Sequence, residues 1–301
     1  PSIDFRLSHL PKQTTSPLVY QKQFLKMRES YPDHLFLYTD GSSCSDAVAC
    51  GFYCIRATKS FRLHSKCSIF TAEMYAIFEA LKYIESATLR RVVICSDSLS
   101  SLQAVSRPSS DYLTLSVQSL IHRLLSRRYD LVLSWVPGHV SIRGNELADQ
   151  AAKSATRKTR IDIPSVPLSD VQAFLKRSVL RAWQTEWHNS TFKLSAIKNS
   201  VYPWRSSSRS CRREEVILTR LRIGHCHFSH GFILRNETPP ICDSCQTVLS
   251  VEHVLLYCRK FVGSRRRHDL GNSLQVVLGD DDSALSKLFC FLRESRIYNF
   301  I

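Results

Sequence analysis

The chain has 301 residues, 44% of them hydrophobic, which is enough to bury one large core or two ordinary ones and argues against a disordered polymer. Lys and Arg outnumber Asp and Glu by 41 to 26, and the formal charge of +15 attracts polyanions, so nucleic acid is the first partner to consider. No apolar run approaches the ~20 residues of a membrane span, and the first residues lack a signal-peptide pattern, so neither membrane insertion nor secretion is supported.

The cysteines point to the compartment. Eleven is an odd number, and several of them stand inside apolar, strand-like segments instead of at the regular spacings of a disulfide framework. We therefore expect a reduced, intracellular protein, nuclear or cytoplasmic. The chain begins with Pro1 instead of Met, which hints at a piece of a longer protein.

In chain order, residues 1–33 mix Pro, Lys, Thr and Ser around one short helical piece, and we interpret them as a lead-in or linker. Residues 34–156 then alternate strand and helix patterns: three strands, an amphipathic helix, a buried strand, two helices, the strand LVLSWV and a closing helix. This order predicts an α/β domain with a mixed five-stranded sheet flanked by helices.

The remainder of the chain has another character. Residues 157–168 are basic and contain proline, which predicts a linker. Residues 169–301 predict a basic, mostly helical region that opens with an amphipathic helix ending in tryptophans. Packing of that helix on a small core of its own is the favoured interpretation, and a base-stacking platform is the alternative.

Four acids in residues 34–156 follow elements that can bring them together. Asp40 and Asp97 are expected at the carboxyl ends of strands, where ligands meet open α/β sheets, while Glu73 is expected in the first turn of a helix and Asp149 on the last helix. Each alone suits an ordinary role as a turn, cap or surface residue. Together, with His139 on the loop after LVLSWV, they can hold two Mg²⁺ ions ~4 Å apart for an in-line displacement at phosphorus.

The motifs YTDGSS, TAEMYAIFEAL, ICSDS and WVPGHVSIRGNELADQAAK carry a resemblance to a known family. In this order and spacing, residues 34–155 resemble a type 1 ribonuclease H domain. The resemblance implies a ribonuclease H-like fold, hydrolysis of the RNA strand of RNA/DNA hybrids, and two Mg²⁺ ions, with Mn²⁺ as a substitute. It assigns Asp40, Glu73, Asp97 and Asp149 as metal ligands and His139 to proton transfer or product release.

The same resemblance indicates substrate contacts. The matching positions are Gly41, Ser42, Ser98, Asn145 and Glu146. A glycine at 41 would let the backbone approach the hybrid, whose 2′-hydroxyls mark its RNA strand. The basic protrusion that some cellular members insert after the fourth strand is missing, so we expect the grip on the hybrid to come from elsewhere.

A cluster of potential soft ligands lies in the tail. Cys242, Cys245, His253 and Cys258 follow the pattern C-x2-C-x7-H-x4-C, which can close a four-ligand structural Zn²⁺ site within residues 242–258. Unliganded core cysteines are the alternative, because only one CxxC is present.

The tail also carries a resemblance of its own. LTRLRIGHCHFSHGFIL followed by ICDSCQTVLSVEHVLLYC resembles the region after the ribonuclease H domain in non-LTR retrotransposons of the Jockey and I-like lineages. It implies a retroelement origin and an upstream reverse transcriptase as a partner. One rival function is a catalytically silent nucleic-acid-binding remnant, against which the four acids and His139 argue. Another is a transposase or integrase, but these enzymes have no metal ligand on the helix that carries Glu73 here.

Overall fold

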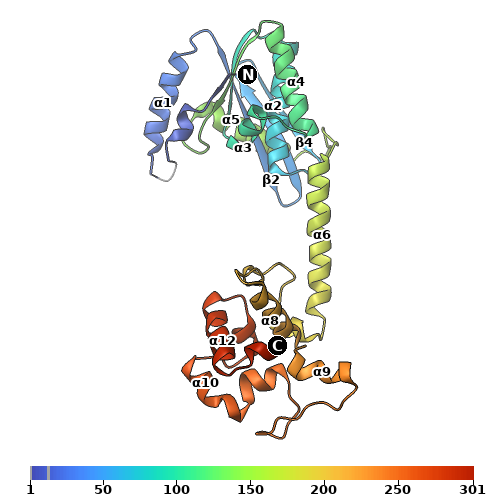
Figure 1. The fold of residues 1–301 in the computed structure, drawn as a ribbon. Helices are drawn as coiled ribbons and strands as arrows, with labels where there is room; N and C mark the ends of the chain where they lie inside the picture. Colours follow the sequence, from blue (N-terminus) through green and yellow to red (C-terminus); the bar gives the residue numbers. More distant parts are fainter. Residues whose placement is uncertain (1, 12–13) are drawn as a thin grey trace. The chain divides into compact units, whose positions relative to one another are not determined.

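The computed structural model describes residues 2–11 and 14–301, so that Pro1, Lys12 and Gln13 lie outside it. The chain divides into two compact units, Pro1–Lys176 and Arg177–Ile301. The first is built around a β-sheet and the second is helical (Figure 1). The boundary between them falls inside a helix and not in the predicted linker 157–168.

The first unit has an α/β fold with a mixed sheet, which confirms the predicted fold class. Its elements are β1 (Ser2–Asp4), η1 (Arg6–His9), α1 (Pro17–Glu29), β2 (Leu35–Cys44), β3 (Ala47–Cys54), β4 (Ala57–Leu63), α2 (Ile69–Ser86), β5 (Arg91–Ser96), α3 (Leu99–Ser106), α4 (Tyr112–Ser126), β6 (Asp130–Trp135), α5 (Arg143–Ala155) and the start of α6 (Leu168–His188). The strand order is β1-β6-β5-β2-β3-β4. The first four strands of this order run parallel; β3 pairs antiparallel with β2, and β4 pairs antiparallel with β3.

Helices cover the sheet on both faces. On one face α2 packs on β2 and β3 with α4 alongside, and α5 packs on the opposite face of the same strands (Figure 1). Both α2 and α4 begin at a side-chain cap, because Ser68 Oγ accepts from the Thr71 amide and the Asp111 carboxylate from the Thr114 amide. Gly51 allows α5 to approach β3, since a Cβ there would lie 2.9 Å from the backbone nitrogen of Ala152.

The first residues of the chain belong to this unit, so the interpretation of residues 1–33 as a lead-in was wrong for the residues described. Strand β1 pairs in parallel with β6 and gives the sheet six strands where five were predicted. Helix α1 buries Tyr20, Phe24 and Met27 in the main core. A three-residue strand is too short for an alternating pattern, and its partner lies far along the chain, which is why the sequence pattern missed it.

The second unit packs its helices around a separate core. Its elements after α6 are α7 (Lys193–Ile197), η2 (Arg205–Ser207), α8 (Arg212–Ile223), α9 (His227–Arg235), η3 (His253–Tyr257), η4 (Arg259–Phe261), α10 (Val262–Arg267), α11 (Leu274–Leu278), α12 (Asp282–Glu294) and η5 (Tyr298–Phe300). The core is formed mainly by apolar residues of α8, α11 and α12, such as Leu221, Leu278 and Phe291. The predicted helical tail is therefore a folded unit.

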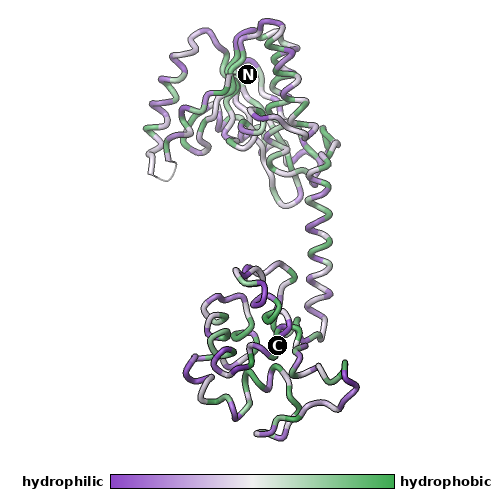
Figure 2. Tube along the Cα trace, viewed as in Figure 1, coloured by the Kyte–Doolittle hydropathy of each residue, from purple (hydrophilic) through white to green (hydrophobic). Residues whose placement is uncertain are grey.

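Helix α6 carries the predicted amphipathic pattern, and Figure 2 shows polar and apolar residues alternating along it. Its apolar stripe is not packed on a core of its own, however, because Leu175, Val179 and Trp183 are exposed. Asp170 is the one buried residue of this helix, and it accepts hydrogen bonds from the Ser68 amide and Thr71 Oγ1. None of the helices in the described ranges has both the length and the apolar character needed to cross a membrane.

Candidate active site

Two neighbouring parallel strands bring Asp40 and Asp97 to the same level of the sheet. Thr39 and Ser96 form the last pair between β2 and β5, and one of these acids follows each of them directly. Asp97 leaves its strand there, as predicted. Asp40 does not, because β2 continues to Cys44 as a partner of β3. The Asp40 carboxylate lies at the end of the parallel part of the sheet because the neighbouring strand β5 ends at Ser96, although β2 itself continues.

Glu73 completes a compact trio of carboxylates. The sequence pattern predicts it in the first turn of α2, but it lies in the second turn. Gly41 lets α2 come close to β2, since a Cβ there would lie 2.9 Å from the backbone nitrogen of Glu73. One oxygen each of Asp40, Glu73 and Asp97 lie within 4.8 Å of one another. Such a set of hard oxygen donors suits Mg²⁺ or Mn²⁺.

The electrostatics of the three carboxyls favour binding of a cation. Burial, together with the charges of Glu73, Asp97 and Asp149, raises the pKa of Asp40 to about 9. Burial and the charge of Asp97 raise the pKa of Glu73 to about 8. Glu73 Oε2 is also buried without a hydrogen-bond partner among the described residues. A divalent cation would satisfy this oxygen and favour the ionised form of all the carboxyls, so the residues fit the metal that the sequence pattern predicts.

Asp149 reaches the same cleft from α5. Its Oδ2 atom accepts from Nζ of Lys153 at 2.7 Å, one helical turn further on. Lys153 also lines the cleft, although no sequence motif singled it out. The signal was present in the spacing, because residues four apart on a helix lie side by side.

The loop after β6 places His139 at the cleft. The Val136 amide donates to the Ser96 carbonyl at 3.0 Å, and Trp135 Nε1 donates to the Asp97 carbonyl at 3.1 Å, so the start of the loop is fixed beside β5. Gly138 allows the loop to lie close to Asp97, since a Cβ there would lie 2.5 Å from Asp97 Oδ2. His139 itself is exposed and lines the cleft, where it can meet a substrate.

The residues predicted to contact substrate separate into two groups. Gly41, Ser42 and Glu146 line the cleft, whose volume is about 340 Å³. Asn145 lines it too, but it is buried and its Nδ2 donates to Asp97 Oδ2 at 3.1 Å, so it orients a carboxylate. Ser98 is not among the lining residues. Its hydroxyl accepts from the Ser101 amide and caps α3.

The second unit gathers the four predicted soft ligands. One ligand atom each of Cys242, Cys245, His253 and Cys258 lie within 4.8 Å of one another. The Sγ atoms of Cys242 and Cys258 are 3.6 Å apart, and those of Cys245 and Cys258 are 4.0 Å apart. A tetrahedron with Zn–S bonds of about 2.3 Å has edges of about 3.8 Å, which agrees with both separations.

The surroundings of these atoms also fit a cation. The nearby side chain of His253 holds the pKa of Cys242 down, at about 7, which favours the thiolate that binds metals. His253 Nε2 is buried without a partner in the described part of the chain, while Nδ1 contacts Thr247 Oγ1 at 3.3 Å, an arrangement that leaves Nε2 for a metal. The Arg259 amide donates to Cys245 Sγ at 3.3 Å.

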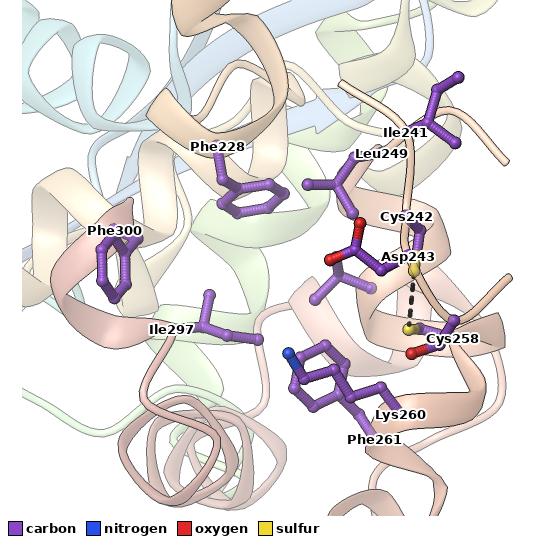
Figure 3. A pocket seen from close by; sticks show the side chains of 12 residues that line it. Phe228, Ile241, Cys242, Asp243, Leu249, Cys258, Lys260, Phe261, Ile297 and Phe300 are labelled. Carbon is purple, nitrogen blue, oxygen red and sulfur yellow. Dashed lines mark hydrogen bonds between the residues drawn. The ribbon is translucent and has the colours of Figure 1, made fainter. Parts of the chain in front are cut away.

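An apolar pocket of about 220 Å³ adjoins this cluster. Figure 3 shows Cys242 and Cys258 facing each other at its edge, with Phe228, Phe261 and Ile297 on its walls. Both of these cysteines are buried.

Comparison with known proteins defines the class of the first unit. Residues 32–157, less than half of the chain, match the family model of RNase H. This segment is a ribonuclease H domain, and the chain thus carries a ribonuclease H enzyme domain. A solved structure of RNase H1 from the halophilic archaeon Halobacterium salinarum is similar at 20% identity and a TM-score of 0.35, over 40% of this chain and 96% of that one. No curated protein matches the chain.

Proposed function

We propose that this chain is an endonuclease that hydrolyses the RNA strand of RNA/DNA hybrids with two divalent ions, Mg²⁺ or Mn²⁺. The observation that carries the proposal is the convergence of acids from four elements: β2, α2, the end of β5 and α5 supply Asp40, Glu73, Asp97 and Asp149 to one cleft. His139 stands beside them. A cleft used only to grip a polyanion would not be lined with buried acids, because acids repel phosphate.

Each residue has a distinct task in this proposal. The four acids would hold the ions, which when bound supply a nucleophilic water and neutralise charge on the phosphate. Asn145 fixes the carboxylate of Asp97 through its hydrogen bond. His139, exposed beside the cleft, moves a proton or helps the product leave. Cleavage in this manner leaves 3′-hydroxyl and 5′-phosphate ends.

The substrate would be recognised at the rim of the cleft. Gly41 and Ser42 present backbone and hydroxyl groups there, and Glu146 is an exposed side chain of the same cleft. Such groups suit the 2′-hydroxyls in the minor groove of a hybrid. The formal charge of +15 supplies the sequence-independent attraction.

We further propose that the second unit is a zinc-stabilised module of a retroelement protein. Cys242, Cys245, His253 and Cys258 would hold one structural Zn²⁺ with no open position for chemistry. The order of a ribonuclease H domain followed by a Cys/His cluster supports an origin in a non-LTR retrotransposon, with an upstream reverse transcriptase as partner and an intracellular location.

The decisive experiment compares the full chain with Asp40→Asn on one labelled sequence as RNA/DNA hybrid, double-stranded RNA and double-stranded DNA. We expect Mg²⁺-dependent cleavage of the RNA strand of the hybrid alone. Asp40→Asn should lower the rate by at least about 10³-fold, the scale of removing a group that acts on the reacting phosphate, with unchanged circular dichroism. An unchanged rate in this variant would refute the mechanism.

The same assay separates the rival function. A parent chain that binds the hybrid in a gel-shift experiment but cuts no substrate would identify a silent nucleic-acid-binding remnant. Cleavage of double-stranded DNA in preference to hybrid would point to a transposase or integrase.

A further inference from the structure

We infer that Gln21, on helix α1, is a positioning residue that holds the loop carrying His139. The role of the histidine rests on the proposed function, whereas the contact between Gln21 and the loop is independent of it. Gln21 Nε2 donates to the carbonyl oxygen of Val140 at 2.9 Å, across 119 residues of sequence. Helix α1 ends at Glu29, before the RNase H family match begins at residue 32. A segment outside the match therefore contacts the site within it.

The loop needs such support because its backbone is strained. His139 and Ser141 have φ values of 62° and 59°, in the left-handed region that non-glycine residues rarely adopt. Two such residues in one short loop persist only where the surroundings impose the conformation. Val140, between them, is 6% exposed and belongs to the main core. Its side chain is held in the core, and its carbonyl oxygen accepts the hydrogen bond from Gln21.

Helix α1 is itself a fixed support. Tyr20, next to Gln21, is fully buried, and its hydroxyl donates to the Leu10 carbonyl at 2.7 Å. Phe24, one turn later, has its ring 6.2 Å from those of Phe36 and Tyr38 on β2. The chain before α1 is anchored as well, since β1 pairs with β6, the strand that leads into the loop. The donor atom of Gln21 is therefore held in register with the carbonyl that it binds.

The consequence concerns turnover more than binding. Without the Gln21 donor the Val140 carbonyl loses its partner, and the loop is freed to leave the strained conformation that sets His139 at the cleft. Because the carboxylates are held by other elements, the affinity for the hybrid should change little. The expected result is a loss of about threefold to tenfold in kcat, the equivalent of one hydrogen bond, with KM nearly constant.

The test uses Gln21→Met, which keeps length and helix propensity but removes the donor. The matched control is Gln23→Met on the same helix, because Gln23 is also partly buried and its side chain makes no hydrogen bond to the described residues. Cleavage is measured for both variants in the wild-type and His139→Ala backgrounds. Hydrogen exchange of residues 137–142 is followed by mass spectrometry. Thermal unfolding verifies that each variant is folded.

We expect Gln21→Met to lower kcat in the wild-type background, to have no added effect beside His139→Ala, and to speed exchange in residues 137–142. Gln23→Met should do none of these. An equal loss in the His139→Ala background, or unchanged exchange in the loop, would overturn the inference. A parent that cleaves no hybrid would refute the proposed function instead, and the exchange measurement would still decide whether Gln21 holds the loop.

Discussion

The two units build their clusters of potential metal ligands in opposite ways. In the first unit the acids are spread from Asp40 to Asp149, and they meet only because a sheet and two helices are assembled around a large apolar core. In the second unit all four ligands lie between Cys242 and Cys258, in a segment with one isolated β-bridge and short helical turns. A fold that is stable by itself can present a site for an exchangeable ion, whereas a segment with little regular structure needs its ion to stay folded.

Removal of zinc should produce the largest difference between the units. Cys245→Ser, or treatment with a strong chelator, should unfold the region around residues 242–258 and leave the first unit intact, because zinc binding contributes about 10–16 kcal/mol in small structural sites. Elemental analysis should show a fall from about one zinc per chain, the stoichiometry of a closed four-ligand site. Limited proteolysis should then cut within the second unit first.

Cys211→Ser is the matched control for this experiment, since Cys211 is an exposed cysteine of the same unit outside the cluster. It should retain its zinc and its resistance to proteolysis. Absence of zinc from the parent chain would contradict the contrast between the units.

A second experiment asks how far the first unit extends. Phe24→Ala on α1 should lower the free energy of unfolding of this unit by about 3–5 kcal/mol, because the ring is 6% exposed and its removal leaves a cavity. Leu25→Ala, at a neighbouring position that is 55% exposed, is the control and should change little. Urea unfolding followed by circular dichroism provides the measurement. Equal effects of the two substitutions would mean that α1 is a lead-in after all.

The third experiment follows the pH dependence of the stability of the first unit in the presence of a chelator. Asp40 and Glu73 have folded pKa values of about 9 and about 8, well above the range near 4 of an unfolded carboxyl. The folded state thus holds protons that the unfolded chain releases. The stability that these two carboxyls contribute is therefore fully present below about pH 4 and is lost as the pH rises through about 8 to 9.

Urea unfolding at about pH 5, 7 and 9 should therefore show a decline that added Mg²⁺ suppresses, because the ion takes the place of the protons. Asp40→Asn should weaken the decline, since one of the two buried carboxyls is gone. Stability that rises with pH in the chelator would show that these carboxyls are ionised without a cation. The second unit should not share the response to Mg²⁺, because its cluster offers sulfur and nitrogen ligands.

Sequence patterns predicted the parts of the molecule whose signals are local. The strands and helices of residues 34–156 have clear periodicity, and the acids follow them at positions where a sheet brings side chains together. The spacing of Cys242, Cys245, His253 and Cys258 likewise sufficed to place four ligands in one cluster.

The features that sequence did not predict depend on pairing across long distances or on exact side-chain geometry. Strand β1 is three residues long and is defined only by its partner β6. Ser98 was expected at the substrate but is used as a helix cap, a role that the same hydroxyl fills equally well. Gln21 carries no motif at all, because its partner is a backbone carbonyl, which every residue has.

The pairing of β1 with β6 has a practical consequence for anyone who shortens this chain. Residues 32–157 would seem the natural fragment to produce, yet that cut removes β1 and leaves β6 as the outermost strand. Its residues Leu131, Val132 and Leu133 are buried in the full unit, and the cut would bare its hydrogen-bonding groups along an apolar edge. Unpaired edges of this kind invite aggregation between molecules, whereas an outermost strand of three residues offers little to pair with.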